Sequence, residues 1–147
     1  MSRSGGALLV FAKQPRPGRV KTRMVPPLSP QQAADFYREL LGDVLAATIR
    51  VAAELGLAPI LAVDPPAAVR ELAGQAPSGF RVIAQRGGGL GERMDWAIRE
   101  AAAGGVDRIL LRGSDSPILG SERICQSFWS YALSTESISS IGVIHSR

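Results

Sequence analysis

Five cationic side chains lie within eleven residues near the N-terminus, and no acidic residue separates them. The segment runs from Lys13 to Arg23 and has the sequence KQPRPGRVKTR. Its prolines stiffen the chain and Gly18 permits a tight turn, so the cations can converge on one anionic group. This pattern favours phosphate binding, since uncompensated cations repel one another until an anion arrives. A solvated basic loop is the alternative interpretation, and the spacing alone leaves both open.

Two further polar segments contain groups that could contact a nucleotide. The first runs from Gln85 to Met94 (QRGGGLGERM). Its glycines let a ligand approach the backbone, and the N–H groups of a following helix favour an anion or a polar base edge. The second is GSDSP, in which Asp115 offers a carboxylate suited to a hard divalent cation. A plain loop is the alternative for the first segment, and an Asx turn or helix cap for the second.

The sequence around these segments predicts alternating strands and helices. Continuous apolar runs, typical of parallel strands covered on both faces, occupy residues 7–12, 57–63, 80–84 and 108–112. Helices are expected between them, at residues 30–55, 67–73 and 90–103. This alternation implies right-handed crossovers and a mainly parallel, Rossmann-like α/β sheet with helices on both faces. The polar segments then follow the carboxyl ends of strands, where such sheets bind ligands.

The helix expected at residues 30–55 has clear signals at both ends. Ser29 is the predicted N-cap, Pro30 suits the first helical position, and Gln32 completes a capping box. Gly56 is expected to end the helix. Its predicted apolar stripe comprises Phe36, Leu40, Val44, Leu45, Ala52 and Leu55.

The composition changes near Ser114. Residues 114–147 hold ten serines, whereas residues 1–113 hold four. A helix is expected at residues 121–133 and a strand at residues 138–144. Cys125 and His145 have no partner at catalytic spacing, so we interpret both as structural or incidental.

The charge of the chain is concentrated in one place. The net charge is +4, yet residues 1–34 hold six basic groups and no acid, while the other 113 residues hold 11 basic and 13 acidic groups. A compact anionic ligand fits this distribution better than nucleic acid, whose binders spread cations over a face and add aromatic residues. One cysteine and one histidine exclude an internal disulfide and a Cys/His zinc cluster, and favour the cytoplasm. No apolar run approaches the roughly 20 residues of a membrane span.

Four motifs together resemble those of a known family. The family pattern is F-A-K-x-P-x-P-G-x-V-K-T-R-[LM], then L-S-P, then Q-x-G-x-x-L-G-x-R-M, then G-S-D-x-P. The chain has them in this order, at residues 11–24, 28–30, 85–94 and 113–117. It therefore resembles a bacterial family of glycosyltransferase-type proteins with the nucleotide-diphospho-sugar transferase (GT-A) fold, long known as a domain of unknown function. The resemblance covers about residues 7–119.

The resemblance implies a nucleotide site with a divalent metal. Asp115 would ligate Mg²⁺ or Mn²⁺, and the basic loop would face the nucleotide phosphates. The implied nucleotide-binding residues are Ala12, Lys13, Gly18, Lys21 and Arg23 on the phosphate side, and Gln85, Gly87, Gly91 and Arg93 on the base and ribose side. The same fold serves nucleotidyltransferases, including guanylyltransferases, so the fold alone does not choose the reaction.

The tail departs from the family pattern. Family members continue with an Asp-Gly-Gly-Tyr segment that helps to form the acceptor and metal site, and residues 121–147 contain none. We therefore expect one domain over residues 1–147, with a family-like core at 7–119 and a truncated or altered serine-rich tail at 120–147. A nucleotide-sugar or nucleotide is the expected partner, with weak turnover or none and a homo-oligomer formed through the tail. A nucleotidyltransferase and a non-catalytic nucleotide-binding or oligomerising domain are the alternatives.

Overall fold

Five strands form one sheet in the order β3-β2-β1-β4-β5. The structure is a computed structural model that describes residues 5–114 and 129–132. The strands are β1 (Gly5–Lys13), β2 (Leu57–Asp64), β3 (Arg81–Ala84), β4 (Val106–Gly113) and β5 (Trp129–Ala132). The first four are parallel and β5 is antiparallel to β4. The predicted mainly parallel α/β sheet is therefore confirmed.

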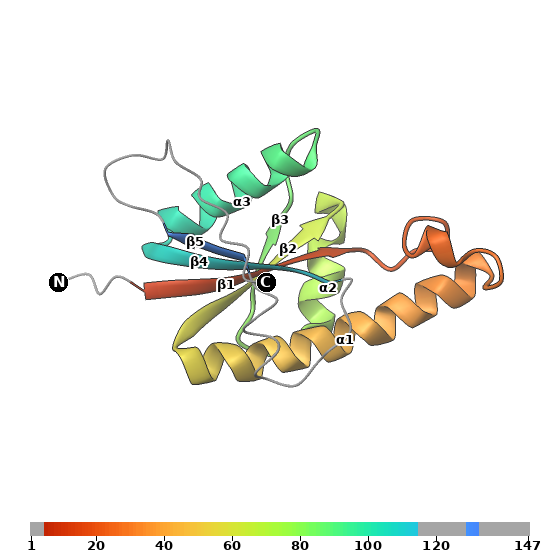
Figure 1. Cartoon of the computed structure of the whole chain (residues 1–147), viewed down its shortest axis with the longest axis horizontal. Coiled ribbons are helices and arrows are strands. Elements are labelled where there is room, and N and C mark those ends of the chain that lie inside the picture. Colours follow the sequence, from red (N-terminus) through yellow and green to blue (C-terminus); the bar gives the residue numbers. More distant parts are fainter. Residues whose placement is uncertain (1–4, 115–128, 133–147) are drawn as a thin grey trace.

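Helices cover both faces of the sheet, as Figure 1 shows. The described residues form the α-helices α1 (Pro30–Leu55), α2 (Val69–Gln75) and α3 (Leu90–Ala103), and the short 3-10 helices η1 (Thr22–Met24) and η2 (Pro66–Ala68). Along β1, Val10 and Ala12 pack with α1 and α2, whereas Ala7 and Leu9 pack with α3. Each of these four side chains is at most 2% exposed. The continuous apolar run of β1 thus serves two hydrophobic layers, because successive side chains point to opposite faces.

The ends of α1 form as the sequence predicts. Ser29 Oγ accepts a hydrogen bond from the Gln32 N–H, and the Gln32 side chain accepts one from the Ser29 N–H, which completes the capping box. Gly56 ends the helix in a left-handed conformation. In the described part of the chain, neither α1 nor any other helix is long and apolar enough to cross a membrane.

The predicted apolar stripe of α1 is partly wrong. Phe36 and Leu55 are 46% and 48% exposed, whereas Tyr37, Leu41 and Val51 are buried. The buried face runs at helical spacing through Tyr37, Leu41, Val44, Thr48 and Val51, and the predicted stripe began one residue too early. Because Tyr37 belongs to the buried face of α1, its side chain points toward the sheet and reaches the end of β1.

The chain order places a switch point between β1 and β4. From β1 the chain adds β2 and then β3 on one side, and it returns through α3 to form β4 on the other side of β1. In sheets of this type the crevice at such a reversal, beyond the carboxyl ends of the strands, is where ligands bind.

One expectation for the tail is contradicted within the described residues. Residues 129–132 were expected to lie in a helix, but they form β5, whose Ile109↔Tyr131 register pairs it with the outer edge of β4. Trp and Tyr favour strands, and the open edge of β4 offers unpaired backbone groups for them to join. The remainder of the helix expected at 121–133, the strand expected at 138–144, Cys125 and His145 lie outside the described residues.

Candidate functional site

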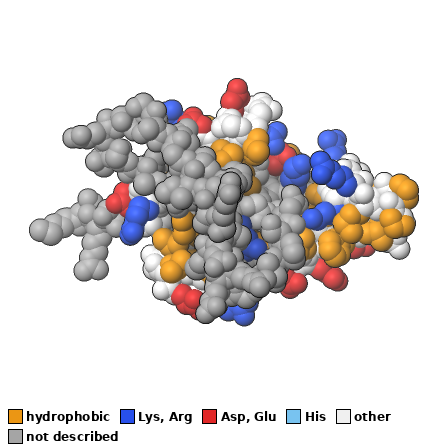
Figure 2. All heavy atoms as spheres, viewed as in Figure 1, with side chains coloured by type: hydrophobic (Ala, Val, Ile, Leu, Met, Phe, Trp, Pro, Cys, Tyr) orange, Lys and Arg blue, Asp and Glu red, His pale blue; other side chains and the backbone are white. Residues whose placement is uncertain are grey.

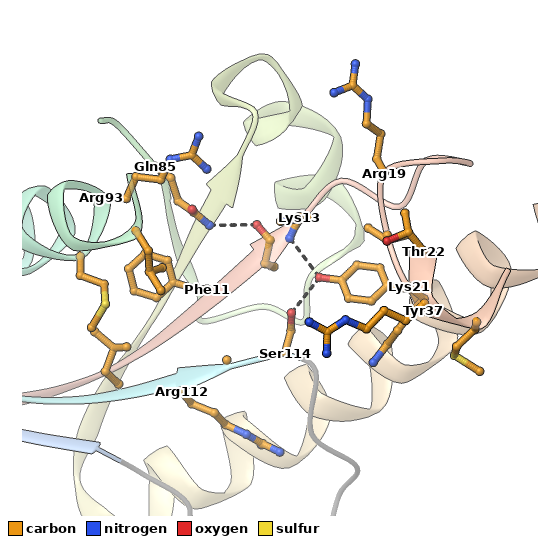
Figure 3. Close-up of a pocket in the computed structure, with 18 of the residues that line it drawn as sticks. Phe11, Lys13, Arg19, Lys21, Thr22, Tyr37, Gln85, Arg93, Arg112 and Ser114 are labelled. Carbon is orange, nitrogen blue, oxygen red and sulfur yellow. Dashed lines mark hydrogen bonds between the residues drawn. The ribbon is translucent and has the colours of Figure 1, made fainter. Parts of the chain in front are cut away.

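A cavity of about 1120 Å³ opens at the switch point. It is lined by the carboxyl ends of β1 and β4, the basic loop after β1, the first turns of α1, the end of β3 and the loop that leads into α3. Figure 3 shows ten of its lining residues with labels. The volume is slightly above the roughly 300–1,000 Å³ of typical ligand pockets, so it is large enough for a small organic ligand such as a nucleotide.

The basic loop is held to the core at both of its ends. Gln14 and Val20 are buried, and the Gln14 side chain donates a hydrogen bond to Glu71 on α2. Between these anchors the loop turns at Pro17 and Gly18, and the Arg19 N–H donates to the Arg16 carbonyl at 3.1 Å. Gly18 has φ of +78°, as the third position of a type II turn requires. The predicted tight turn is thus present, and it fixes where the flanking cations leave the backbone.

Lys21 has an unusual backbone conformation. Its φ is 51° and its ψ is 36°, which makes it the one non-glycine residue with positive φ in residues 5–114. This conformation costs a residue with a Cβ about 1 kcal/mol or more. Such strain clusters at functional sites, and Lys21 lines the cavity directly before η1.

Cations dominate the polar lining of the cavity. Six of them contribute to its wall: Lys13, Arg19, Lys21, Arg23, Arg93 and Arg112. No acidic residue lines the cavity in the described part of the chain. One of the six, Arg93, shares its charge with Asp64 at 3.1 Å. Figure 2 shows Lys and Arg side chains gathered at the end of the molecule formed by the basic loop. The site therefore has the electrostatics of an anion-binding pocket.

Arg112 is the deepest of these cations and was not predicted. It follows the apolar centre of β4 and is 4% exposed. Burial lowers the pKa of its guanidinium, because desolvation disfavours the charged form. The sequence offered a signal for Arg112, because it directly follows the apolar run Ile109–Leu111 of β4 and buried arginines are rare without a polar role.

Tyr37 joins three elements in the wall of the cavity. Its hydroxyl accepts a hydrogen bond from the Lys13 N–H at 3.0 Å and lies 2.7 Å from Ser114 Oγ. Both bonds are drawn in Figure 3. The side chain is 2% exposed, so the contact ties α1 to the carboxyl ends of β1 and β4 inside the core. Neither Tyr37 nor Ser114 was among the predicted site residues.

Gln85 joins the neighbouring strand ends in the same way. Its Nε2 donates to the carbonyl oxygens of Ala12 at 3.1 Å and Ala62 at 2.9 Å. Its backbone N–H donates to the Val63 carbonyl at 2.8 Å. Gln85 is 7% exposed and lines the cavity together with Ala12.

Side chains at the start of α3 form hydrogen bonds with the backbone of the glycine-rich loop that precedes it. The Gly88 N–H donates to the Glu92 carboxylate at 2.9 Å, and Arg93 Nε donates to the Gly87 carbonyl at 3.1 Å. Gly87 has φ of +130°, and a Cβ at this position would lie 2.8 Å from Glu92 Cβ. The Gly88 amide, expected to be open to a ligand, is therefore engaged by Glu92.

The cavity brings together six of the nine predicted nucleotide-binding residues. Ala12, Lys13, Lys21, Arg23, Gln85 and Arg93 all line it. Gly18 and Gly87 lie in the adjoining loops, Gly91 lies in the first turn of α3, and none of the three lines it. Nucleotide binding by any of the nine stays a prediction.

The described residues do not provide a metal site. In residues 5–114 no three His, Cys, Asp or Glu side chains lie close enough together to hold a metal ion. Asp64, the acid at the end of β2, is engaged by Arg93. Asp115 directly follows Ser114 but lies outside the described residues, so its role as the ligand of Mg²⁺ or Mn²⁺ stays a prediction.

Comparison with protein-family models places the chain in a family, through residues that follow the basic loop. A family model described as "Uncharacterized protein conserved in bacteria (DUF2064)" matches residues 45–138. The match extends past residue 119, so the similarity to the family also includes part of the serine-rich tail. A search of curated proteins finds no match.

Two solved structures resemble the chain. One, from Desulfovibrio desulfuricans G20, is described as a "putative nucleotide-diphospho-sugar transferase"; it is 31% identical, with a TM-score of 0.65 over 84% of this chain and 53% of that chain. The other, Rv0371c from Mycobacterium tuberculosis H37Rv, is 22% identical, with a TM-score of 0.45 over 84% of this chain and 59% of that chain. The chain thus spans somewhat more than half the length of either structure. The first structure confirms the predicted fold.

Proposed function

The chain belongs to the bacterial family DUF2064, and from this premise we propose that it binds a nucleotide-sugar and takes part in glycosyl transfer. The observation that carries the proposal is the cavity at the switch point, with six cations and no described acid in its wall. The similarity to a protein described as a "putative nucleotide-diphospho-sugar transferase" supports the same ligand class. We also propose that the protein acts in the cytoplasm. Its single cysteine cannot form a disulfide within the chain, and proteins without disulfides are typical of this reducing compartment.

The cations would act on the diphosphate. When the bond between the sugar carbon and the phosphate oxygen breaks, the departing nucleoside diphosphate gains negative charge. Lys13, Lys21 and Arg23 would stabilise that charge more strongly in the transition state than in the bound substrate, which is the condition for catalysis. The turn at Gly18 and the left-handed backbone at Lys21 set the backbone positions from which Lys21 and Arg23 extend. We assign no general base to a described residue.

The first test removes two cations of the basic loop. In the Lys21→Ala/Arg23→Ala variant, calorimetric titration with UDP or GDP should give a Kd raised by more than about tenfold, because each lost charge-assisted hydrogen bond contributes about 1.5–3 kcal/mol. The matched control is Arg50→Ala/Arg70→Ala, which removes two exposed cations outside the cavity. Equal affinity in both double variants would refute phosphate binding by the loop.

The products distinguish the possible reactions. Release of a nucleoside diphosphate from a nucleotide-sugar supports glycosyl transfer, whereas release of pyrophosphate from a nucleoside triphosphate supports nucleotidyl transfer. Binding without either product supports a non-catalytic nucleotide-binding domain.

The metal is a separate proposal and depends on Asp115. The variant Asp115→Asn keeps the shape of the side chain and removes its charge. We expect the increase in nucleotide affinity on addition of Mn²⁺ to fall, while the Tm measured without metal changes little. Full metal dependence in the variant would show that another group is the ligand.

A further inference from the structure

The side-chain amide of Gln85 is held in one orientation. Both N–H groups of Nε2 are used by the backbone carbonyls of Ala12 and Ala62. Carbonyl oxygens only accept hydrogen bonds, so the amide cannot be turned over without losing both. Its Oε1 makes no hydrogen bond with any residue in the described part of the chain. The cavity wall therefore contains a fixed acceptor on a residue that is 7% exposed.

The two ends of the cavity differ in chemistry, because the cation at one end, Arg93, is engaged by Asp64, whereas the other end holds cations of the basic loop. In Figure 3, Phe11, Gln85 and Arg93 lie at one end, Arg19 and Lys21 lie at the other, and Lys13 lies between them. The apolar side chains of Leu90 and Met94 also line the cavity, and both belong to α3. A ligand with its phosphates on the cations of the basic loop would place its flat, less charged part near Phe11 and Gln85.

We propose that Gln85 Oε1 accepts a hydrogen bond from an N–H of the nucleobase and so selects the base. The inference rests on the proposed function, because it requires the phosphates to occupy the cationic end. A base that offers no N–H would leave Oε1 desolvated and without a partner, which costs affinity. Ala12 and Ala62 enforce this requirement, since they prevent the amide from presenting its donor instead.

The test uses pairs of nucleotides that differ by one donor. Uracil and hypoxanthine each carry a single N–H, at N3 and N1, and methylation of that nitrogen removes it. We expect UDP to bind at least about fivefold more tightly than 3-methyl-UDP, and IDP to bind similarly more tightly than 1-methyl-IDP. The 5-methyl derivative of UDP controls for bulk, because it adds a methyl group and keeps the N3–H.

The variant Gln85→Met assigns the discrimination to the amide. In this variant each methylated nucleotide should bind as well as its parent. The proposal is overturned if wild-type protein binds each pair equally, or if the discrimination persists in the variant. It is also overturned if 2′-deoxy-UDP or 3′-deoxy-UDP, rather than 3-methyl-UDP, shows the Gln85-dependent loss, because Oε1 would then contact the ribose. Should the variant fail to fold, the wild-type comparison alone still decides between equal and unequal binding.

The outcomes separate this inference from the proposed function. Nucleotides that bind through Lys21 and Arg23 without regard to the base N–H would refute the role of Gln85 alone. Failure of every nucleotide to bind, or binding that is insensitive to Lys21→Ala/Arg23→Ala, would refute both.

Discussion

Tyr37 positions other residues of the cavity wall through the hydrogen bonds of its hydroxyl. Its hydroxyl lies between the Lys13 N–H and Ser114 Oγ, which are 24 and 77 residues away in the chain. The two groups belong to the strands on either side of the switch point. Tyr37 thereby sets the relation between the start of the basic loop and the end of β4, where the segment containing Asp115 begins.

Removal of this hydroxyl should loosen the site. We expect Tyr37→Phe to lower the free energy of unfolding in urea by about 1–2 kcal/mol, because the buried Ser114 hydroxyl and the Lys13 N–H lose a partner. The double variant Tyr37→Phe/Ser114→Ala should cost less than the sum of the single variants, since both remove the same hydrogen bond. Strictly additive effects would show that the pair does not interact in solution.

The residue types of the sequence predict which charged and polar groups line the cavity. They do not predict the hydrogen bonds that hold its wall together. Lys21, Arg23 and Gln85 were predicted from a charge cluster and from family motifs, and all three line the cavity. Tyr37 and Ser114 could not be predicted in this way, because their partners are brought together only by the packed sheet. Arg112 can be predicted in principle, because it directly follows the apolar centre of β4.

Local signals predicted most of the secondary structure. The capping box at Ser29, the glycine at position 56 and the apolar strand runs act within a few residues, so the limits of α1 and α3 agree with the prediction. Which residues of α1 are buried, and whether residues 129–132 form a strand, depend instead on what each segment packs against. The residue type of Phe36 favours the core, but its place on α1 leaves it 46% exposed. The local sequence of residues 129–132 contains no sign of the β4 edge with which they pair.

The conformation of the glycine-rich loop between β3 and α3 can be tested by substituting its glycines. Gly87→Ala should lower the free energy of unfolding by about 1–3 kcal/mol, because φ is +130° and the new Cβ would meet Glu92 and the backbone of Arg93. Gly91→Ala is the matched control. Gly91 lies in the first turn of α3 with no atom within 4 Å of an added Cβ, so the change should leave stability unchanged or raise it by up to about 1 kcal/mol.

Chemical denaturation of the two variants measures this difference. If Gly87→Ala proves as stable as Gly91→Ala, the loop has enough freedom to relax, and the contact between Glu92 and the Gly88 N–H does not define its conformation.

The charge distribution of the whole molecule predicts salt-sensitive binding. The net charge of +4 arises from the N-terminal segment that forms the basic loop. Raising the NaCl concentration from about 0.05 M to about 0.5 M should weaken UDP binding markedly, because the screening length falls from above 10 Å to a few Å. The dependence should be shallower in Lys21→Ala/Arg23→Ala and unchanged in Arg50→Ala/Arg70→Ala. Salt-independent affinity would place the nucleotide away from the cations.

The position of β1 at the centre of the sheet has a consequence for the order of folding. β1 pairs with β2 across one connection, but its pairing with β4 closes a loop of roughly 100 residues, so it costs more chain entropy and forms late. The cavity needs the pairing of β1 with β4, since residues at the carboxyl ends of both strands line it. A chain that is still being synthesised therefore gains its binding pocket only after β4 has joined the sheet, and a bound nucleotide would slow the unfolding of the entire assembled sheet rather than of one loop.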